Sequence, residues 1–149
     1  MRPLVLTCLV LVLVPAGCGG SDGRRAPADA GDVIRGWAED VREGHFAAAT
    51  RRFALPATVG NGGPATTLRT AAEVDDFNRG LACGAVVTAT RPIAGGRTLA
   101  TFRLTERAGP VPSCGTGVGR EAQVTVRVRD GRITEWLRVG DAPPGSVEV

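Results

Sequence analysis

The sequence contains no lysine and no tyrosine, and it has a single histidine. Its basic residues never form a run longer than a pair, as at Arg24-Arg25 and Arg51-Arg52, which argues against a nucleic-acid partner. The pattern also lacks a metal-ligand cluster, a phosphate-binding loop and a Ser-His-Asp arrangement, so we expect no metal or cofactor. No apolar run approaches the roughly 20 residues that a membrane-spanning helix needs.

The first 17 residues have the composition of a secretory signal peptide. Arg2 supplies a charged start, an apolar run follows over residues 4–14, and small residues precede Cys18. The segment Val14-Pro15-Ala16-Gly17-Cys18 resembles the lipobox of bacterial lipoproteins, although Pro15 departs from the Leu, Val or Ala that is usual there. The resemblance implies that Cys18 becomes the lipid-bearing first residue. We therefore expect a membrane-anchored protein on the extracytoplasmic side of the cell membrane.

The rest of the chain has the length of one domain. Residues 18–31 are small, polar and interrupted by proline, which predicts a flexible tether. We expect the folded domain over residues 32–141 and a short tail over residues 142–149.

Four cysteines are present, and their expected fates differ. Cys8 leaves with the signal peptide and Cys18 carries the lipid. Cys83 and Cys114 then remain in an oxidising compartment, where two cysteines usually pair. We predict a disulfide between them, which stabilises the domain by about 3–4 kcal/mol. A redox role is not expected, because the sequence has no Cys-x-x-Cys motif.

Helical periodicity dominates the first half of the domain. Apolar residues recur every three to four positions over residues 32–43, and a second short helix is expected over residues 45–53. Pro56 prevents any continuation of this second helix. Thr70 and Glu73 fit a capping box, which predicts the start of a third helix that ends near Cys83.

The second half alternates in the manner of β-strands. A short strand is expected over residues 55–59, and longer ones are expected over residues 85–93, 98–106, 121–129 and 132–139. Asp130-Gly131 predicts a tight hairpin between the last two. One face of the predicted sheet is apolar, with Phe102, Leu104 and Leu137 on it, and must be covered by the helices. The fold class is therefore α+β, with three N-terminal helices packed on an antiparallel sheet.

Several segments resemble the nuclear transport factor 2-like (NTF2-like) superfamily, which includes the SnoaL-like proteins. They are Gly44-His45-Phe46-Ala47-Ala48-Ala49, Phe53-Ala54-Leu55-Pro56, Thr70-Ala71-Ala72-Glu73-Val74-Asp75-Asp76-Phe77 and Arg129-Asp130-Gly131-Arg132-Ile133-Thr134-Glu135-Trp136. The resemblance implies a cone-like curved sheet around helices that encloses a pocket, and dimers formed through the outer face of the sheet. His45 occupies the place where the family usually has a helix-capping Asp.

Three residues are candidates for acid–base chemistry. Alternation places Glu106 and Glu135 on the apolar face, where burial raises a carboxyl pKa and suits a general acid or base. The alternative, which we favour, places them at strand ends in contact with water. His45 is the only side chain with an unperturbed pKa near neutrality, but it has no evident carboxylate to orient it. We favour a cap or surface role for it.

Two further groups of residues are candidates for binding. Trp37, Phe77 and Phe102 are expected to line a pocket or, as the alternative, to pack in the core. Trp136 lies among Arg103, Arg127 and Arg138 on the predicted outer face, where Trp and Arg favour an interface. The alternative is a solvated sheet with a cation–π contact.

Two functions follow from these observations. We favour a lipid-anchored domain that acts as a small-molecule-binding or protein-interaction module, with an apolar ligand or a second copy of the chain as partner. The alternative is a small-molecule isomerase, lyase or hydrolase that uses a pocket carboxylate.

Overall fold

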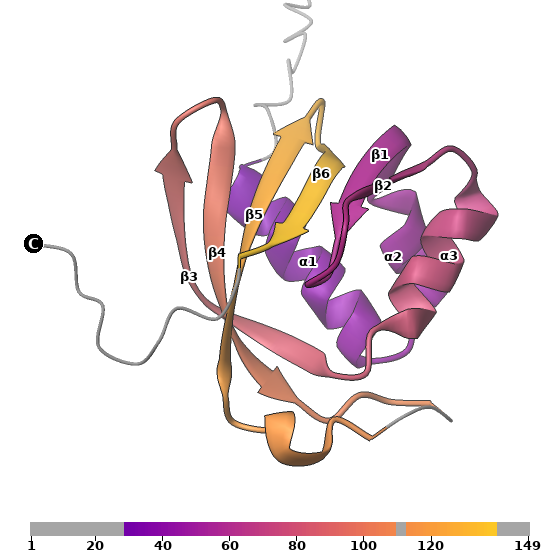
Figure 1. The fold of residues 1–149 in the computed structure, drawn as a ribbon, viewed down its shortest axis with the longest axis vertical. Helices are drawn as coiled ribbons and strands as arrows, with labels where there is room; N and C mark the ends of the chain where they lie inside the picture. The colour runs from indigo at the N-terminus through magenta and orange to yellow at the C-terminus, as the bar shows by residue number, and fades with distance from the viewer. Residues whose placement is uncertain (1–28, 110–112, 140–149) are drawn as a thin grey trace, which may run out of the picture.

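The computed structural model describes residues 29–109 and 113–139. The predicted signal peptide, Cys18, most of the tether and the C-terminal tail lie outside these residues. Within the described part, three α-helices precede most of a six-stranded sheet, as the sequence predicts for an α+β fold (Figure 1). No helix in this part is long and apolar enough to cross a bilayer.

The three predicted helices are present, although the first begins at residue 30 and not at residue 32. They are α1 (Ala30–Arg42), α2 (Phe46–Arg51) and α3 (Ala71–Gly80). The Asp29 side chain accepts from the Gly31 N–H at the start of α1, and Thr70 and Glu73 form the capping box of α3. Both caps satisfy N–H groups that have no partner within the helix. His45 precedes α2 without a side-chain cap hydrogen bond, so it does not replace a capping Asp.

The six strands form one mixed sheet. They are β1 (Phe53–Gly60), β2 (Thr66–Leu68), β3 (Gly84–Ile93), β4 (Arg97–Thr105), β5 (Glu121–Arg129) and β6 (Arg132–Arg138), in the order β2-β1-β6-β5-β4-β3. The long strands confirm the predicted ones to within one or two residues. The prediction of a wholly antiparallel sheet is wrong, because β1 pairs with β6 in parallel. Strand β2 was not predicted, because three residues are too few to show alternation.

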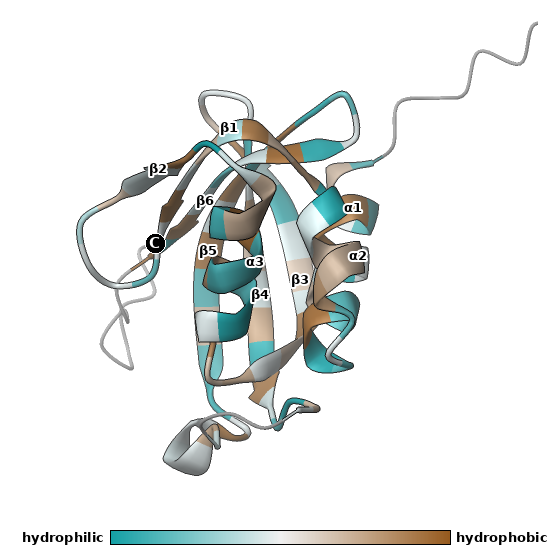
Figure 2. Ribbon diagram, turned by 90° about the vertical axis from the view of Figure 1, so that its right-hand side faces the viewer, coloured by the Kyte–Doolittle hydropathy of each residue, from teal (hydrophilic) through white to brown (hydrophobic). Residues whose placement is uncertain are grey.

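The helices cover one face of the sheet and form the core with it. Figure 1 shows the sheet bending around α1, and Figure 2 shows the helices together on one side of the strands. Strands β4 and β5 alternate between apolar residues that face the helices and polar residues that face away. Ile34, Val74, Val126 and Ile133 are completely or almost completely buried between the two layers.

A β-bulge in β6 changes which side chains reach this core. Arg127 of β5 lies opposite Glu135, but its neighbour Val128 lies opposite Ile133, so β6 carries one extra residue at Thr134. The extra residue reverses the alternation, and both Ile133 and Trp136 face inward. The predicted outward orientation of Trp136 is therefore wrong.

The long connection between β4 and β5 is attached to the end of α3. Cys83 and Cys114 form the predicted disulfide. The Arg107 guanidinium donates to the backbone carbonyls of Asn78 and Arg79, at 3.2 and 3.1 Å, near the C-terminus of α3. The described part of this glycine-rich connection is thus tied covalently and by hydrogen bonds to the segment that leads into β3.

Candidate functional site

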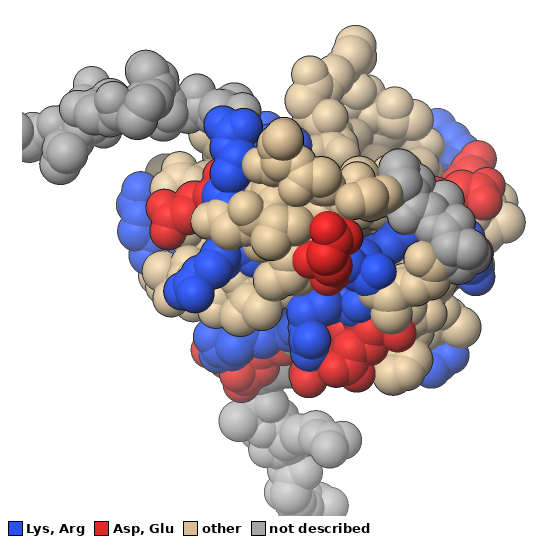
Figure 3. Space-filling model, turned by 90° about the horizontal axis from the view of Figure 1, so that it is seen from below, with Lys and Arg blue, Asp and Glu red and all other residues tan. Residues whose placement is uncertain are grey.

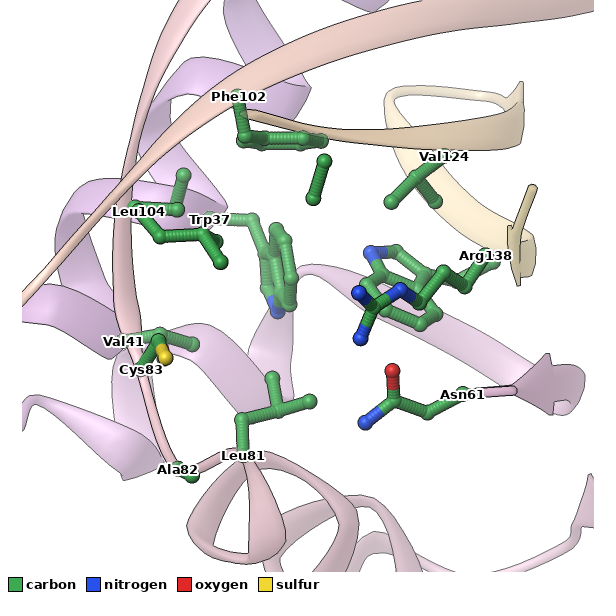
Figure 4. A pocket seen from close by; sticks show the side chains of 14 residues that line it. Trp37, Val41, Asn61, Leu81, Ala82, Cys83, Phe102, Leu104, Val124 and Arg138 are labelled. Atoms are coloured by element: carbon green, nitrogen blue, oxygen red, sulfur yellow. The ribbon is translucent and has the colours of Figure 1, made fainter. Parts of the chain in front are cut away.

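A small apolar pocket lies between α1 and the concave face of the sheet (Figure 4). Its volume is about 130 Å³, close to that of apolar protein cavities of about 150 Å³ that take up benzene. Helix α1, strands β3 to β6 and the connections after β1 and α3 all contribute to it. The lining residues are Trp37, Ala38, Val41, Asn61, Leu81, Ala82, Cys83, Ala85, Phe102, Leu104, Ala122, Val124, Trp136 and Arg138.

Trp37 of α1 is the aromatic centre of this pocket. Its ring meets those of Trp136 and Phe102 edge to face, with centroids 5.6 and 6.3 Å apart. The Trp37 Nε1–H donates to Asn78 Oδ1 at 3.0 Å, and Asn78 is completely buried. The Asn78 amide in turn donates to the Thr50 hydroxyl. This chain of hydrogen bonds fixes the orientation of the Trp37 ring at the pocket wall.

Trp136 differs from Trp37 in the hydrogen bonding of its indole N–H. The Trp136 side chain is buried, and its Nε1–H has no hydrogen-bond partner among the described residues. Buried donors are nearly always paired in native proteins, so an orphan at a pocket wall marks a place where a ligand atom or a water is expected.

The pocket has polar groups on one side only. Figure 4 shows Arg138 and Asn61 on the side opposite Val41 and Leu104, with the Arg138 guanidinium directed toward the pocket. Arg138 is the only charged residue among the described lining residues, and none of them is acidic. The sequence prediction placed Arg138 on the outer face; the bulge at Thr134 moves it inward together with Trp136.

The predicted pocket-lining residues occupy two neighbouring sites. Trp37 and Phe102 line the pocket described above. Phe77 packs against the core and against Trp136, with centroids 5.3 Å apart, but it lines a more open hollow between α3 and the β1–β2 connection.

Neither predicted carboxylate lies in the pocket. Glu135 is on the opposite face of the sheet, where it pairs with the Arg97 guanidinium. The hydrogen bond from Arg97 holds the pKa of Glu135 below its ordinary value, against the smaller effect of burial. Glu106 is exposed just beyond β4, and its carboxylate accepts from the Cys114 N–H at 3.4 Å. The hypothesis of a raised carboxyl pKa inside the pocket is therefore wrong for Glu135, and Glu106 has the strand-end position.

His45 and the outer arginines lie away from the pocket. His45 is exposed, with Nδ1 3.8 Å from a carboxylate oxygen of Glu43. Arg103 and Arg127 remain on the outer face, but this face lacks the predicted Trp136 anchor. Seen from below, arginines lie next to acidic residues, so neither sign forms a continuous area in that view (Figure 3). A homodimer through the outer face stays a prediction.

Comparisons with known proteins identify the fold. No family model matches the sequence, and no curated protein matches it. The structure is similar to that of an NTF2-like protein of unknown function from Cytophaga hutchinsonii, with 13% identity, a TM-score of 0.55, and coverage of 72% of this chain and 86% of the other. The chain has the NTF2-like fold.

Two further solved structures are similar to that of this chain. One is a proposed polyketide cyclase from Sinorhizobium meliloti, with 15% identity, a TM-score of 0.53, and coverage of 72% of this chain and 94% of the other. The other is a protein with a ketosteroid isomerase-like fold from Catenulispora acidiphila in complex with trimethylamine, with 14% identity, a TM-score of 0.54, and coverage of 72% and 84%.

Sequence reasoning missed the polar side of the pocket. Asn61 lies in the glycine-rich segment after β1, which carries no periodicity from which its position could be predicted. The inward orientation of Trp136 and Arg138 depends on one extra residue in β6. The only trace of it in the sequence is the apolar pair Ile133 and Trp136, which are spaced by three positions instead of two.

Proposed function

We propose that the chain is a lipid-anchored extracytoplasmic domain that binds a small apolar molecule in the pocket between α1 and the sheet. The observation that carries this proposal is the lining, which is apolar and aromatic apart from Arg138 and Asn61 on one side. Ligand pockets typically combine such a wall with a few polar groups that orient the ligand. The volume suits a ligand about the size of one ring.

The polar groups favour binding over acid–base catalysis. The lining offers an indole N–H and a guanidinium, which donate hydrogen bonds but do not abstract protons near neutral pH. The carboxylates that the isomerase, lyase or hydrolase hypothesis needs lie elsewhere, with Glu135 paired to Arg97 and Glu106 exposed. The complex of the Catenulispora acidiphila protein with trimethylamine supports a role for this fold in holding molecules of few atoms.

Membrane anchoring is proposed from the sequence. The lipobox resemblance at Cys18 supports it, and the Cys83–Cys114 disulfide is typical of an oxidising compartment. Cell fractionation of the native protein and a Cys18→Ser variant tests it. The native protein is expected with the membranes and with the added mass of a lipid, whereas the variant is expected without that lipid. Recovery of the native protein unlipidated, with all four of its thiols free, would contradict the proposal.

Ligand binding is tested with toluene, which matches the pocket in size and polarity. A ligand that binds only the folded state stabilises it, by about 1.4 kcal/mol at ten times its dissociation constant. We therefore expect toluene to raise the urea midpoint of unfolding. Ala122→Leu places extra carbons in the pocket and is expected to abolish this rise.

The matched control is Ala94→Leu, an exposed position in the β3–β4 turn that adds the same atoms outside the pocket. This variant is expected to keep the full effect of toluene. If toluene leaves the midpoint of the unmodified protein unchanged, or stabilises Ala122→Leu equally, the pocket does not bind it and the proposed function fails.

A further inference from the structure

We infer that the pocket selects a small carboxylate, one whose apolar body is about the size of a single ring and whose carboxylate group lies against Trp136 and Arg138. This inference rests on the proposed function and names the chemical class of the ligand. It is carried by two donors that the β6 bulge brings to the same side of one apolar pocket.

The first donor is the Trp136 indole. Its Nε1–H is buried and unpaired among the described residues, although the residue lines the pocket. An unpaired buried donor is unfavourable, and the described residues provide no acceptor for it. A ligand oxygen at this position satisfies the donor, whereas a purely hydrocarbon ligand leaves it unpaired. The indole therefore discriminates in favour of molecules that carry an acceptor.

The second donor, Arg138, favours an acceptor with a negative charge. Arg138 follows Trp136 by two residues in β6, so both side chains lie on the same face of the strand, and the guanidinium is directed toward the pocket (Figure 4). A guanidinium binds a carboxylate more strongly than a neutral oxygen, because the hydrogen bonds are charge-assisted. No acidic residue among the described lining residues opposes an anion there.

The rest of the lining limits the size and the polarity of the ligand's body. Trp37, Phe102 and Leu104 supply apolar lining, and a volume of about 130 Å³ leaves room for one ring rather than several. Inorganic anions such as sulfate have no apolar part to contact this lining, and fused-ring molecules are larger than the pocket. Aromatic or cyclic monocarboxylates satisfy both requirements.

The test is isothermal titration at pH 7 with three probes of one shape. Benzoate carries a charged acceptor, benzamide a neutral one, and toluene none. We expect affinity to fall in that order, with benzoate at least about tenfold tighter than toluene. This comparison uses the unmodified protein and so does not depend on the folding of any variant.

Three variants assign the preference to its residues. Arg138→Gln is expected to weaken benzoate at least about tenfold and to leave toluene within about twofold. Trp136→Phe keeps a ring but removes the donor, so it is expected to weaken both benzoate and benzamide relative to toluene. Arg103→Gln removes an exposed arginine from the outer face of the sheet and is expected to change none of the three affinities.

The outcomes separate the two proposals. If toluene binds and benzoate binds no more tightly, the carboxylate inference is overturned while the proposed function stands. A benzoate preference that survives Arg138→Gln overturns the role of the guanidinium, and one that survives Trp136→Phe overturns the role of the indole. If toluene does not bind, the proposed function fails, and the inference that rests on it fails as well.

Discussion

Asn78 connects the three helices through one side chain. It lies in α3, accepts from Trp37 of α1 and donates to Thr50 of α2. Its side chain is completely buried, and its Oδ1 accepts the buried hydrogen bond from the Trp37 indole. The residue thereby sets the position of Trp37 at the pocket wall.

Asn78→Ala is expected to lower the free energy of unfolding by about 1–3 kcal/mol, because the buried Trp37 Nε1–H loses its acceptor. Urea denaturation measures this loss. Asn61→Ala, at an exposed amide, is the control and is expected to cost less than about 0.5 kcal/mol. Equal stability of the two variants would show that the hydrogen-bond chain does not hold the helices together.

Glu135 makes a contribution to stability that depends on pH. Its pKa is lowered in the folded protein, chiefly by the hydrogen bond from Arg97, so the folded state favours the ionised form. This contribution is present above the ordinary carboxyl pKa of 4.5 and is lost as the pH falls through the lower pKa of the folded state.

We therefore expect Glu135→Gln to be less stable than the native protein at pH 7 and the difference to shrink at pH 3. Urea denaturation at the two pH values measures both gaps. Glu121→Gln, at an exposed end of β5, provides the matched control. A gap that widens toward pH 3 would contradict the lowered pKa of Glu135.

Strand β6 is the element that makes the pocket polar. If Thr134 were paired as an ordinary strand residue instead of bulging, the alternation that starts at Ile133 would send Glu135 and Leu137 inward and Trp136 and Arg138 outward. With it, an aromatic donor and a cation reach the concave face, and the carboxylate moves to the outer face beside Arg97. The bulge therefore replaces the predicted inward carboxylate by an indole and a guanidinium at the pocket.

Deletion of Thr134 tests whether this residue is the extra one in β6. The deletion joins Ile133 to Glu135 and restores simple alternation with Trp136 still facing inward, so the tryptophan emission is expected to stay at short wavelength. Deletion of Gly63, in the exposed β1–β2 connection, also removes one residue and is expected to leave the emission nearly unchanged. A shift of the emission to longer wavelength in the Thr134 deletion would show that Thr134 is not the extra residue that sets the orientation of Trp136.

Local signals in the sequence predicted most of the elements. The capping box at Thr70, the Asp130-Gly131 turn and the alternation in β4 and β5 act within a few residues, and the structure bears them out. Long-range pairing was not predictable in the same way. The parallel contact of β1 with β6 joins distant segments, and the bulge at Thr134 depends on how β6 meets β5. The site depends on that bulge, so its apolar wall was predictable but its polar side was not.

At the scale of the whole molecule, the disulfide connects the pocket to the long β4–β5 connection. Cys83 lines the pocket directly after Leu81 and Ala82, and it is bonded to Cys114 in the connection. Gly117 lies so close that an added Cβ would be 3.0 Å from the Cys114 sulfur. The Cys83–Cys114 disulfide thus holds one wall of the pocket in place.

Replacing both cysteines by serine is expected to lower the free energy of unfolding by about 3–4 kcal/mol, the loop-closure value for a sequence separation of 31. Urea denaturation measures the change, and Thr116→Ala in the same connection is the control, with an expected cost below about 0.5 kcal/mol. A double variant as stable as the native protein would contradict the stabilising role of the disulfide.

The central claim is that a small apolar molecule enters the pocket beside both tryptophans. The sequence has two tryptophans, so the spectrum of the ¹⁵N-labelled protein contains two indole N–H signals, and both residues line this pocket. On addition of toluene, we predict that both indole signals shift while the backbone amide signals of Arg103 and Glu121, on the outer face, stay in place. Indole signals that do not move at saturating toluene would contradict the claim.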